Sequence, residues 1–225
     1  TGPRRIAIPD DVAPASQWNP MLPGMRAGPS ADRFVRGATD AGAQPASDAA
    51  IAFAPVWRLS RWIEARALSS ERLTAIYIER IRRFDPRLRS VITLVPEQAL
   101  AAARAADAQI AAGNYLGPLH GIPFGVKDLL DSAGIATTWG AEPFRDNVPA
   151  QDAVVVARLK QAGAILLAKL SLGALALNDV WFGGRTSNPW FLEEGSGGSS
   201  AGSGAAVSAG LVPFAIGSET FGSIV

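Results

Sequence analysis

A run of glycine and serine at residues 195–204 constrains this 225-residue sequence more than any other segment, because only Ala201 interrupts it. Such a run lets the backbone approach a ligand or another backbone segment closely. A second serine, Ser223, follows Ser199 of the run by 24 positions, and Lys127 lies upstream in the apolar segment 122–127. A hydrolase can use one serine as nucleophile, a second as proton relay and a desolvated lysine as base, without a histidine. Ser223, Ser199 and Lys127 are the candidates for these roles.

Lysine is rare in this chain, which has three lysines among its 21 basic residues. An arginine keeps its proton in a protein, whereas burial lowers the pKa of a lysine and can leave a neutral amine that acts as a base. Lys127 has apolar neighbours that suit this role. The alternative is a lysine at a strand end that pairs with Asp128 or Asp131. Lys169, directly after a buried segment, is a rival base.

The glycine-rich run also raises the alternative of a phosphate-binding loop. A P-loop would end in Gly-Lys-Ser/Thr, and a dinucleotide-binding loop needs glycine at its first, third and sixth positions. Counted from Gly195 the sixth residue is Ser200, and counted from Gly202 it is Val207. The sequence therefore argues against nucleotide binding through this run.

Composition narrows the remaining classes of function. With no cysteine and one histidine, His120, the chain excludes disulfides, thiolate zinc sites and His-paired metal clusters, so no metal or cofactor is expected. His120 is expected to be structural.

No apolar run approaches the ~18 residues needed to span a membrane, and the expected location is the cytoplasm. Acidic residues are interspersed with a basic cluster, so we expect a solvated helix face and no direct nucleic-acid binding for Arg80, Arg82, Arg83, Arg87 and Arg89.

The apolar pattern predicts an α/β fold. Residues 1–55 are broken by prolines and have no sustained apolar period, so we expect an extended arm there. Beyond it, segments 122–127 and 164–168 are apolar on both faces, as buried parallel strands are, which predicts a largely buried sheet covered by helices on both faces. Further strands are expected at 91–95 and 211–216, and helices from Ser69 to an end at Pro86, at 96–113, at 152–161 with Asp152 as its cap, and at 203–209.

Three sequence blocks, in the same order, resemble the amidase signature family, whose members hydrolyse or transfer amide groups. They are Leu-His-Gly-Ile-Pro before Lys127, Thr-Ser-Asn-Pro-Trp before the Gly-Gly-Ser-Ser run, and the Gly-Ser-Ile turn at Ser223. The likeness extends over residues 59–225. It implies a mixed sheet of the amidase signature fold, with residues 56–225 as the N-terminal part of the domain. Family members are considerably longer, so a missing C-terminal half is implied as well, completing the sheet and much of the substrate pocket.

The resemblance also implies roles for individual residues. Ser199 would follow a cis peptide bond and hydrogen-bond both Lys127 and Ser223, and Ser200 would be a supporting hydroxyl that holds this relay in line. The Ser223 turn would stabilise the oxyanion through the backbone N–H groups of Thr220, Phe221, Gly222 and Ser223.

The turn departs from the family pattern at two positions. Family members commonly have Asp-x-Gly-Gly-Ser-Ile-Arg, whereas this chain has Phe221 in place of the first glycine and Val225 in place of arginine. The oxyanion hole survives if Phe221 has a negative φ, because a positive φ would strain its bulky side chain. Glu219 loses its usual cationic partner, and we expect a structural role for it.

The preferred function is hydrolysis of a small-molecule carboxamide by acyl transfer. One alternative is the glutaminase A subunit of a tRNA-dependent amidotransferase, which would work with partner subunits. Another is a non-catalytic interaction protein in which the departures at Phe221 and Val225 mark a dead site. As an alternative to amidotransferase subunits, the partner would be a second copy of this chain in a homodimer.

Overall fold

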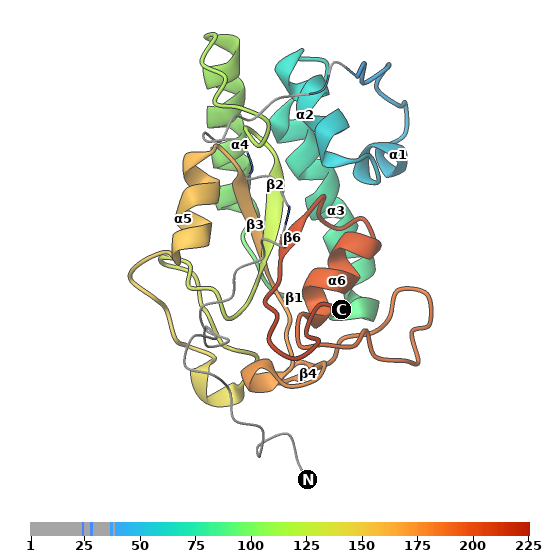
Figure 1. The fold of residues 1–225 in the computed structure, drawn as a ribbon, viewed down its shortest axis with the longest axis vertical. Coiled ribbons are helices and arrows are strands. Elements are labelled where there is room, and N and C mark those ends of the chain that lie inside the picture. Colours follow the sequence, from blue (N-terminus) through green and yellow to red (C-terminus); the bar gives the residue numbers. More distant parts are fainter. Residues whose placement is uncertain (1–23, 25–27, 29–36, 38) are drawn as a thin grey trace. The chain divides into compact units, whose positions relative to one another are not determined.

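The computed structural model describes residues 24, 28, 37 and 39–225 (Figure 1). Contacts group the chain into two units, Thr1–Asp40 and Ala41–Val225, and the described helices and strands lie in the second. Most of the predicted arm, up to residue 38, lies outside the described residues. Its last part contains helix α1, Asp48–Ala52, which Ser47 caps and whose Ile51 and Ala52 are buried. The arm is therefore not extended throughout, and order begins before residue 56.

A four-stranded sheet with the order β1-β3-β2-β6 forms the centre of this unit. Its strands are β1 (Val91–Leu94), β2 (Pro123–Lys127), β3 (Ile165–Leu170) and β6 (Ala215–Ile216). Strand β2 runs parallel to both β3 and β6, and β1 is antiparallel to β3, so the sheet is mixed as predicted. Every residue of β2 and β3 is buried. A small second sheet pairs β4 (Val180–Trp181) with β5 (Gly184–Arg185).

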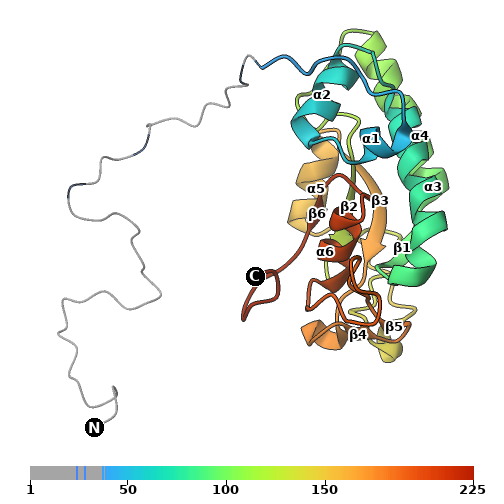
Figure 2. The same ribbon diagram turned by 90° about the vertical axis from the view of Figure 1, so that its right-hand side faces the viewer.

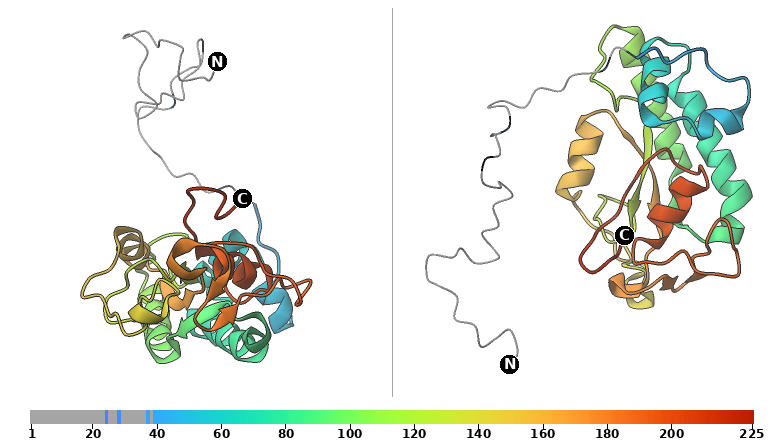
Figure 3. Two further views of the ribbon diagram at one scale, coloured as in Figure 1. Left: turned by 90° about the horizontal axis from the view of Figure 1, so that it is seen from below. Right: turned by 45° about the vertical axis from the view of Figure 1, so that its right-hand side comes forward.

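Helices cover both faces of the sheet, which confirms the predicted layers (Figures 1 and 3). On one face, α5 (Val154–Gln161) packs through Val156 against Phe124, Val126 and Leu166. The other face carries the larger core, in which Leu167 and Leu170 pack with residues of α3 (Ser70–Leu88) and α6 (Ala201–Ser208). Figure 2 shows α4 (Pro96–Ala111) running beside α3. The remaining helices are α2 (Val56–Glu64) and two 3₁₀ turns, Glu142–Phe144 and Ala174–Ala176.

Two predicted helix ends are wrong. Helix α3 continues through Pro86 to Leu88 and ends at Arg89, whose φ is 55°. The Asp85 carboxylate accepts hydrogen bonds from the N–H groups of Ser90 and Val91, which ties the following chain to the helix end.

Asp152 does not cap α5, whose N-cap residue is Ala153. The Asp152 carboxylate instead accepts a hydrogen bond from the Ala133 N–H and pairs with Lys160 at 2.8 Å. The predicted strand at 211–216 also shortens to Ala215–Ile216, because only these residues pair with β2.

The basic cluster of α3 is not wholly solvated. Arg80 donates to the carbonyls of Ala209 and Gly210, just beyond the last turn of α6, at 2.9 and 2.7 Å. These two hydrogen bonds join α3 to the end of α6. The positive charge of Arg80 is also favourable there, because cations are stabilised at the C-terminal end of a helix. Among the described residues, no helix is both long and apolar enough to cross a membrane.

Candidate active site

Lys127 is the last residue of the central strand β2 and is fully buried. Its Nζ lies 2.7 Å from the Oγ of Ser199, 3.0 Å from that of Ser200 and 2.8 Å from that of Ser218. The neighbouring strand β6 runs parallel to β2, so the chain leaving its carboxyl end brings Ser218 to the lysine. Hydroxyl oxygens from two distant segments therefore surround one amine.

The environment of Lys127 favours the neutral amine. Burial lowers the pKa of Lys127 to about 8, against the opposing effect of the Glu219 carboxylate. A neutral amine can accept a proton from a hydroxyl, which an ammonium cannot do. Near pH 8 a substantial fraction of the lysine is therefore competent as a base.

The glycine-rich run places Ser199 directly before Ser200, the N-cap residue of α6. The Gly198–Ser199 peptide bond is cis, as the resemblance implies. A Cβ at position 198 would lie 2.0 Å from the backbone oxygen of Asn178, and one at Gly202 would lie 2.3 Å from that of Ser90. Glycine is required at these two positions because other backbone segments pass directly against them, rather than because a phosphate binds there.

Ser199 connects the lysine to the half-buried Ser223. Its Oγ lies 3.2 Å from the Ser223 Oγ, and the adjacent Ser200 N–H donates to the Ser223 carbonyl at 3.0 Å. Lys127, Ser199 and Ser223 thus form one continuous series of hydrogen-bonded side chains. A cavity of about 380 Å³ opens beside it, lined by Gly198, Ser200, Gly222 and Ser223 among others.

The turn before Ser223 folds around the carboxylate of Glu219. The Ser223 N–H donates to Oε1 at 2.8 Å, and the N–H groups of Gly222, Ile224 and Val225 also donate to this carboxylate. Although desolvation opposes it, these donors hold the pKa of Glu219 below its usual value. Where the resemblance implies an arginine partner for this carboxylate, the chain instead supplies backbone donors.

The predicted oxyanion donors are therefore not all directed to open space. Gly222 and Ser223 point their N–H groups at Glu219, whereas Thr220 and Phe221 are exposed. Phe221 is not among the residues with positive φ, so the strain considered for it does not arise.

Sequence reasoning missed Ser218. Besides its contact with Lys127, Ser218 exchanges two hydrogen bonds with the Ser200 hydroxyl, which donates to the Ser218 carbonyl at 3.0 Å and accepts from its N–H at 3.1 Å. The available signal was its position just after the apolar segment 211–216. If that segment lay beside the lysine strand and parallel to it, Ser218 would come close to Lys127, since the carboxyl ends of parallel strands meet at one sheet edge.

Neither carboxylate considered as a partner for Lys127 pairs with it in the described structure, and the electrostatic effect of Asp131 falls on Lys169. Asp128 pairs instead with Lys169, at 2.9 Å between Oδ1 and Nζ, and both residues are fully buried. Lys169 lies within β3 rather than after it, and its ion pair makes it a poor base.

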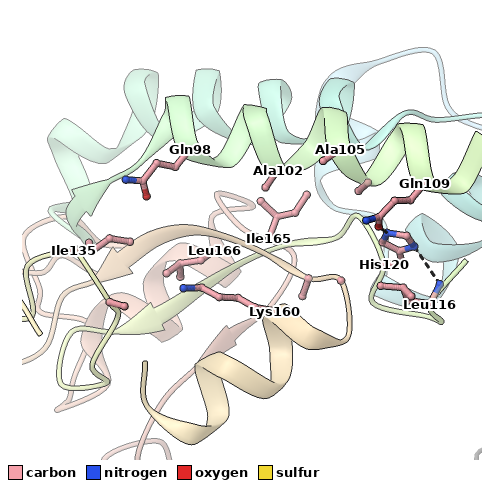
Figure 4. A pocket seen from close by; sticks show the side chains of 14 residues that line it. Gln98, Ala102, Ala105, Gln109, Leu116, His120, Ile135, Lys160, Ile165 and Leu166 are labelled. Atoms are coloured by element: carbon pink, nitrogen blue, oxygen red, sulfur yellow. Dashed lines mark hydrogen bonds between the residues drawn. The ribbon is translucent and has the colours of Figure 1, made fainter. Parts of the chain in front are cut away.

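His120 lies in a separate groove of about 370 Å³ between α4, α5 and β3 (Figure 4). Its Nδ1 accepts a hydrogen bond from the Leu116 N–H at 3.2 Å, and its Nε2 lies 3.0 Å from the Gln109 Oε1. Burial lowers the pKa of His120, with Asp107 opposing the shift. The ring joins a loop to α4 and takes no part in the serine–lysine series. Elsewhere in the described part of the chain, no group of three His, Cys, Asp or Glu is placed to hold a metal ion.

Similarity to known proteins covers the segment that carries this site. Residues 72–225 match the protein family described as Amidase. The chain belongs to the amidase family. This amidase chain is 46% identical over 171 residues to the A subunit of the glutamyl-tRNA(Gln) amidotransferase of Moorella thermoacetica, covering 74% of this chain and 35% of that protein. It is 47% identical over 167 residues to the putative amidase AmiD of Mycobacterium bovis, covering 72% and 34%.

Solved structures agree with the amidase assignment. The native peptide amidase from Stenotrophomonas maltophilia superposes with a TM-score of 0.72 and 40% identity, covering 76% of this chain and 37% of that one. A fatty acid amide hydrolase gives a TM-score of 0.76 and 28% identity, covering 80% and 32%. The amidase chain spans about 35% of the length of the curated relatives it matches.

Proposed function

We propose that this chain carries the nucleophile, relay and base of an amide hydrolase that releases ammonia or an amine from a carboxamide. The observation that supports this is the hydrogen-bonded series from Lys127 through Ser199 to Ser223, with separations of 2.7 and 3.2 Å. Membership of the amidase family points to the same class of bond. We further propose that the protein acts in the cytoplasm.

In the proposed mechanism, the Ser223 Oγ attacks the amide carbonyl carbon. The Ser223 proton moves to Ser199 as the Ser199 proton moves to the neutral amine of Lys127, so one base activates two hydroxyls. When the tetrahedral intermediate collapses, the relay runs in reverse and the proton leaves with the amine. Water then attacks the acyl-enzyme and releases the acid, restoring Ser223.

The oxyanion requires donors that the turn now directs elsewhere. We propose that the N–H groups of Thr220 and Phe221 hold the oxyanion, and that those of Gly222 and Ser223 join them when the substrate displaces the Glu219 carboxylate. One such donor contributes on the order of 3 kcal/mol to stabilising the transition state.

The test is covalent labelling of Ser223 by a fluorophosphonate, together with release of ammonia from a panel of carboxamides. Ser223→Ala is expected to abolish both signals. Ser208→Ala, at the exposed end of α6, is the matched control and should retain them. Labelling of the Ser223→Ala chain at the wild-type rate would refute the assignment. A folded wild-type chain that takes no label would favour the non-catalytic alternative.

A glutaminase subunit is the second candidate, and the 46% identity to the A subunit of an amidotransferase supports it. Glutamine would then be the amide substrate, and its hydrolysis would depend on partner subunits. Glutaminase assays with and without candidate partners separate the two: a stand-alone amidase needs no second chain, whereas an amidotransferase subunit is stimulated by one.

A further inference from the structure

The ion pair between Lys169 and Asp128 is a buried charged group that the proposed mechanism does not use. The Lys169 Nζ lies 2.9 Å from the Asp128 Oδ1, and both residues have no exposed surface. Asp128 directly follows Lys127 in the sequence. The pair therefore lies one residue from the candidate base.

The pair occupies the opposite face of the sheet from the relay. Lys169 is the register partner of Val126, and side chains alternate between faces along a strand. Val126 belongs to the core beneath α5, so Asp128 and Lys169 project to that side, while Lys127 projects toward Ser199. The backbone that Asp128 shares with Lys127 is therefore the structural link between the pair and the relay.

Hydrogen bonds connect the pair to the loop at residues 136–139. The Asp128 Oδ2 accepts from the N–H of Thr138 at 2.9 Å and from its hydroxyl, and Lys169 donates to the Thr137 hydroxyl. The Asp128 backbone is fixed as well, since its N–H donates to Leu170 at 2.9 Å and its carbonyl accepts from Trp139 at 3.0 Å. The ends of β2 and β3 and this loop therefore meet at one carboxylate.

Stability alone does not explain a charged pair at this place. Burial raises the pKa of Asp128 and lowers that of Lys169, so each charge opposes its own burial. Apolar side chains of similar size often stabilise a fold as well as a buried ion pair does, or better. Unlike apolar packing, the ion pair and its hydrogen bonds are directional, so they fix two strand ends and a loop relative to one another.

We propose that Lys169 and Asp128 are positioning residues for Lys127. They hold the carboxyl ends of β2 and β3 in one register. This register keeps the Lys127 amine shielded from water and within hydrogen-bonding distance of Ser199 and Ser218. The consequence for catalysis rests on the proposed function, whereas the consequence for the lysine itself does not.

The neighbouring charges decide which variant tests the proposal. Glu219 acts on Lys127, and Asp131 acts on Lys169. Removing one member of the pair would leave an uncompensated buried charge and destabilise the fold. The double variant Asp128→Asn/Lys169→Met removes both charges at once, so the local net charge near Lys127 is unchanged and the effect measured is that of position and solvation.

The experiment uses the 225-residue chain with isotope-labelled lysine, followed by NMR across a pH titration. With three lysines the wild type gives three signals and the double variant two. The Lys127 pKa is expected to rise by about one unit in the double variant, because water reaches the amine once the strand end relaxes. The rate of fluorophosphonate labelling of Ser223 at pH 7 should fall about tenfold, since one unit reduces the neutral fraction by that factor. Lys160→Met, which breaks the surface pair with Asp152, is the control and should change neither.

The outcomes separate the two proposals. A folded double variant with wild-type Lys127 titration and labelling would overturn the positioning role and leave the pair purely structural. If the double variant does not fold, Thr138→Val removes one donor to Asp128 and is read in the same way: a rise in the Lys127 pKa supports the role and an unchanged titration contradicts it. If Lys127 shifts as expected but the wild type takes no label, the positioning role stands and the proposed function fails.

Discussion

The N–H of Ser200 donates a 3.0 Å hydrogen bond to the carbonyl of Ser223, which ties the start of α6 to the turn of the candidate nucleophile. The Ser200 hydroxyl meanwhile contacts Lys127 and both backbone groups of Ser218. One residue therefore connects the three segments that make up the site. Its backbone contacts the proposed nucleophile, Ser223, and its side chain contacts the proposed base, Lys127.

Ser200→Ala tests this connection. The variant leaves the N–H and carbonyl of Ser218 without their side-chain partner, which should cost about 1–3 kcal/mol of unfolding free energy. Fluorophosphonate labelling of Ser223 should fall roughly tenfold. We expect displacement of Lys127 to raise the activation free energy, and about 1.4 kcal/mol reduces a rate by that factor. Urea unfolding and labelling rates measure the two effects. Ser208→Ala is the control, and equal behaviour of the two variants would contradict the role of Ser200.

The pKa of Lys127 predicts the pH dependence of labelling. Only the neutral amine accepts the relayed proton, so the labelling rate of Ser223 should rise with pH and level off above about 8. Lys127→Arg keeps the positive charge at every accessible pH, and it should lose at least ~100-fold in rate together with this rise. Labelling measured from pH 6 to 10 provides the check. A wild-type rate that is flat over this range would show that Lys127 is not the base.

Glu219→Gln should move that profile toward lower pH. The Glu219 carboxylate raises the pKa of Lys127, so its neutralisation lets burial lower the pKa further, by about half a unit for an exposed charge. High salt should reproduce part of the shift in the wild type through screening. Glu194→Gln, an exposed change with no contact to the relay, is the control. A midpoint that stays fixed or rises would contradict the electrostatic role of Glu219.

Local pattern predicted the buried strands and most of the helices. Segments such as β2 and β3 are apolar on both faces, and that signal is contained in a few consecutive residues. Helix α1 was not predicted, because five residues are too few to show an apolar helical period. It is held by tertiary contacts, including a hydrogen bond from the Tyr77 hydroxyl to the Ala52 carbonyl at 3.0 Å. Pro86 misled for a related reason, since the chain after the helix is held by contacts of the Asp85 carboxylate with Ser90 and Val91, which the proline itself does not reveal.

Some residues of the candidate site were likewise predicted from the sequence, whereas others were not. The choice of Lys127, Ser199 and Ser223 came from residue chemistry and family resemblance, and the structure brings all three together. Ser218 was missed, and Lys169 was expected only as a rival base rather than as the partner of Asp128, because their positions depend on which strands are neighbours, and strand order is a long-range property. The capture of backbone donors by Glu219 depends on the path of a turn, which residue types alone do not specify.

Gly202 and Gly204 of α6 provide a matched pair for the packing of this site. A Cβ at Gly202 would lie 2.3 Å from the Ser90 oxygen and 2.4 Å from the Ser171 nitrogen, whereas nothing lies within 4 Å of one at Gly204. Gly202→Ala should therefore force α6 away from the sheet edge and cost about 1–3 kcal/mol of unfolding free energy. Gly204→Ala should stabilise the helix by about 0.5–1 kcal/mol, because alanine is the better helix former. Urea denaturation measures both. The labelling rate of Ser223 should fall only in Gly202→Ala, because Ser200 is the N-cap residue of α6 and Ser199 directly precedes it. Two variants with the same stability and labelling would refute the close approach at Gly202.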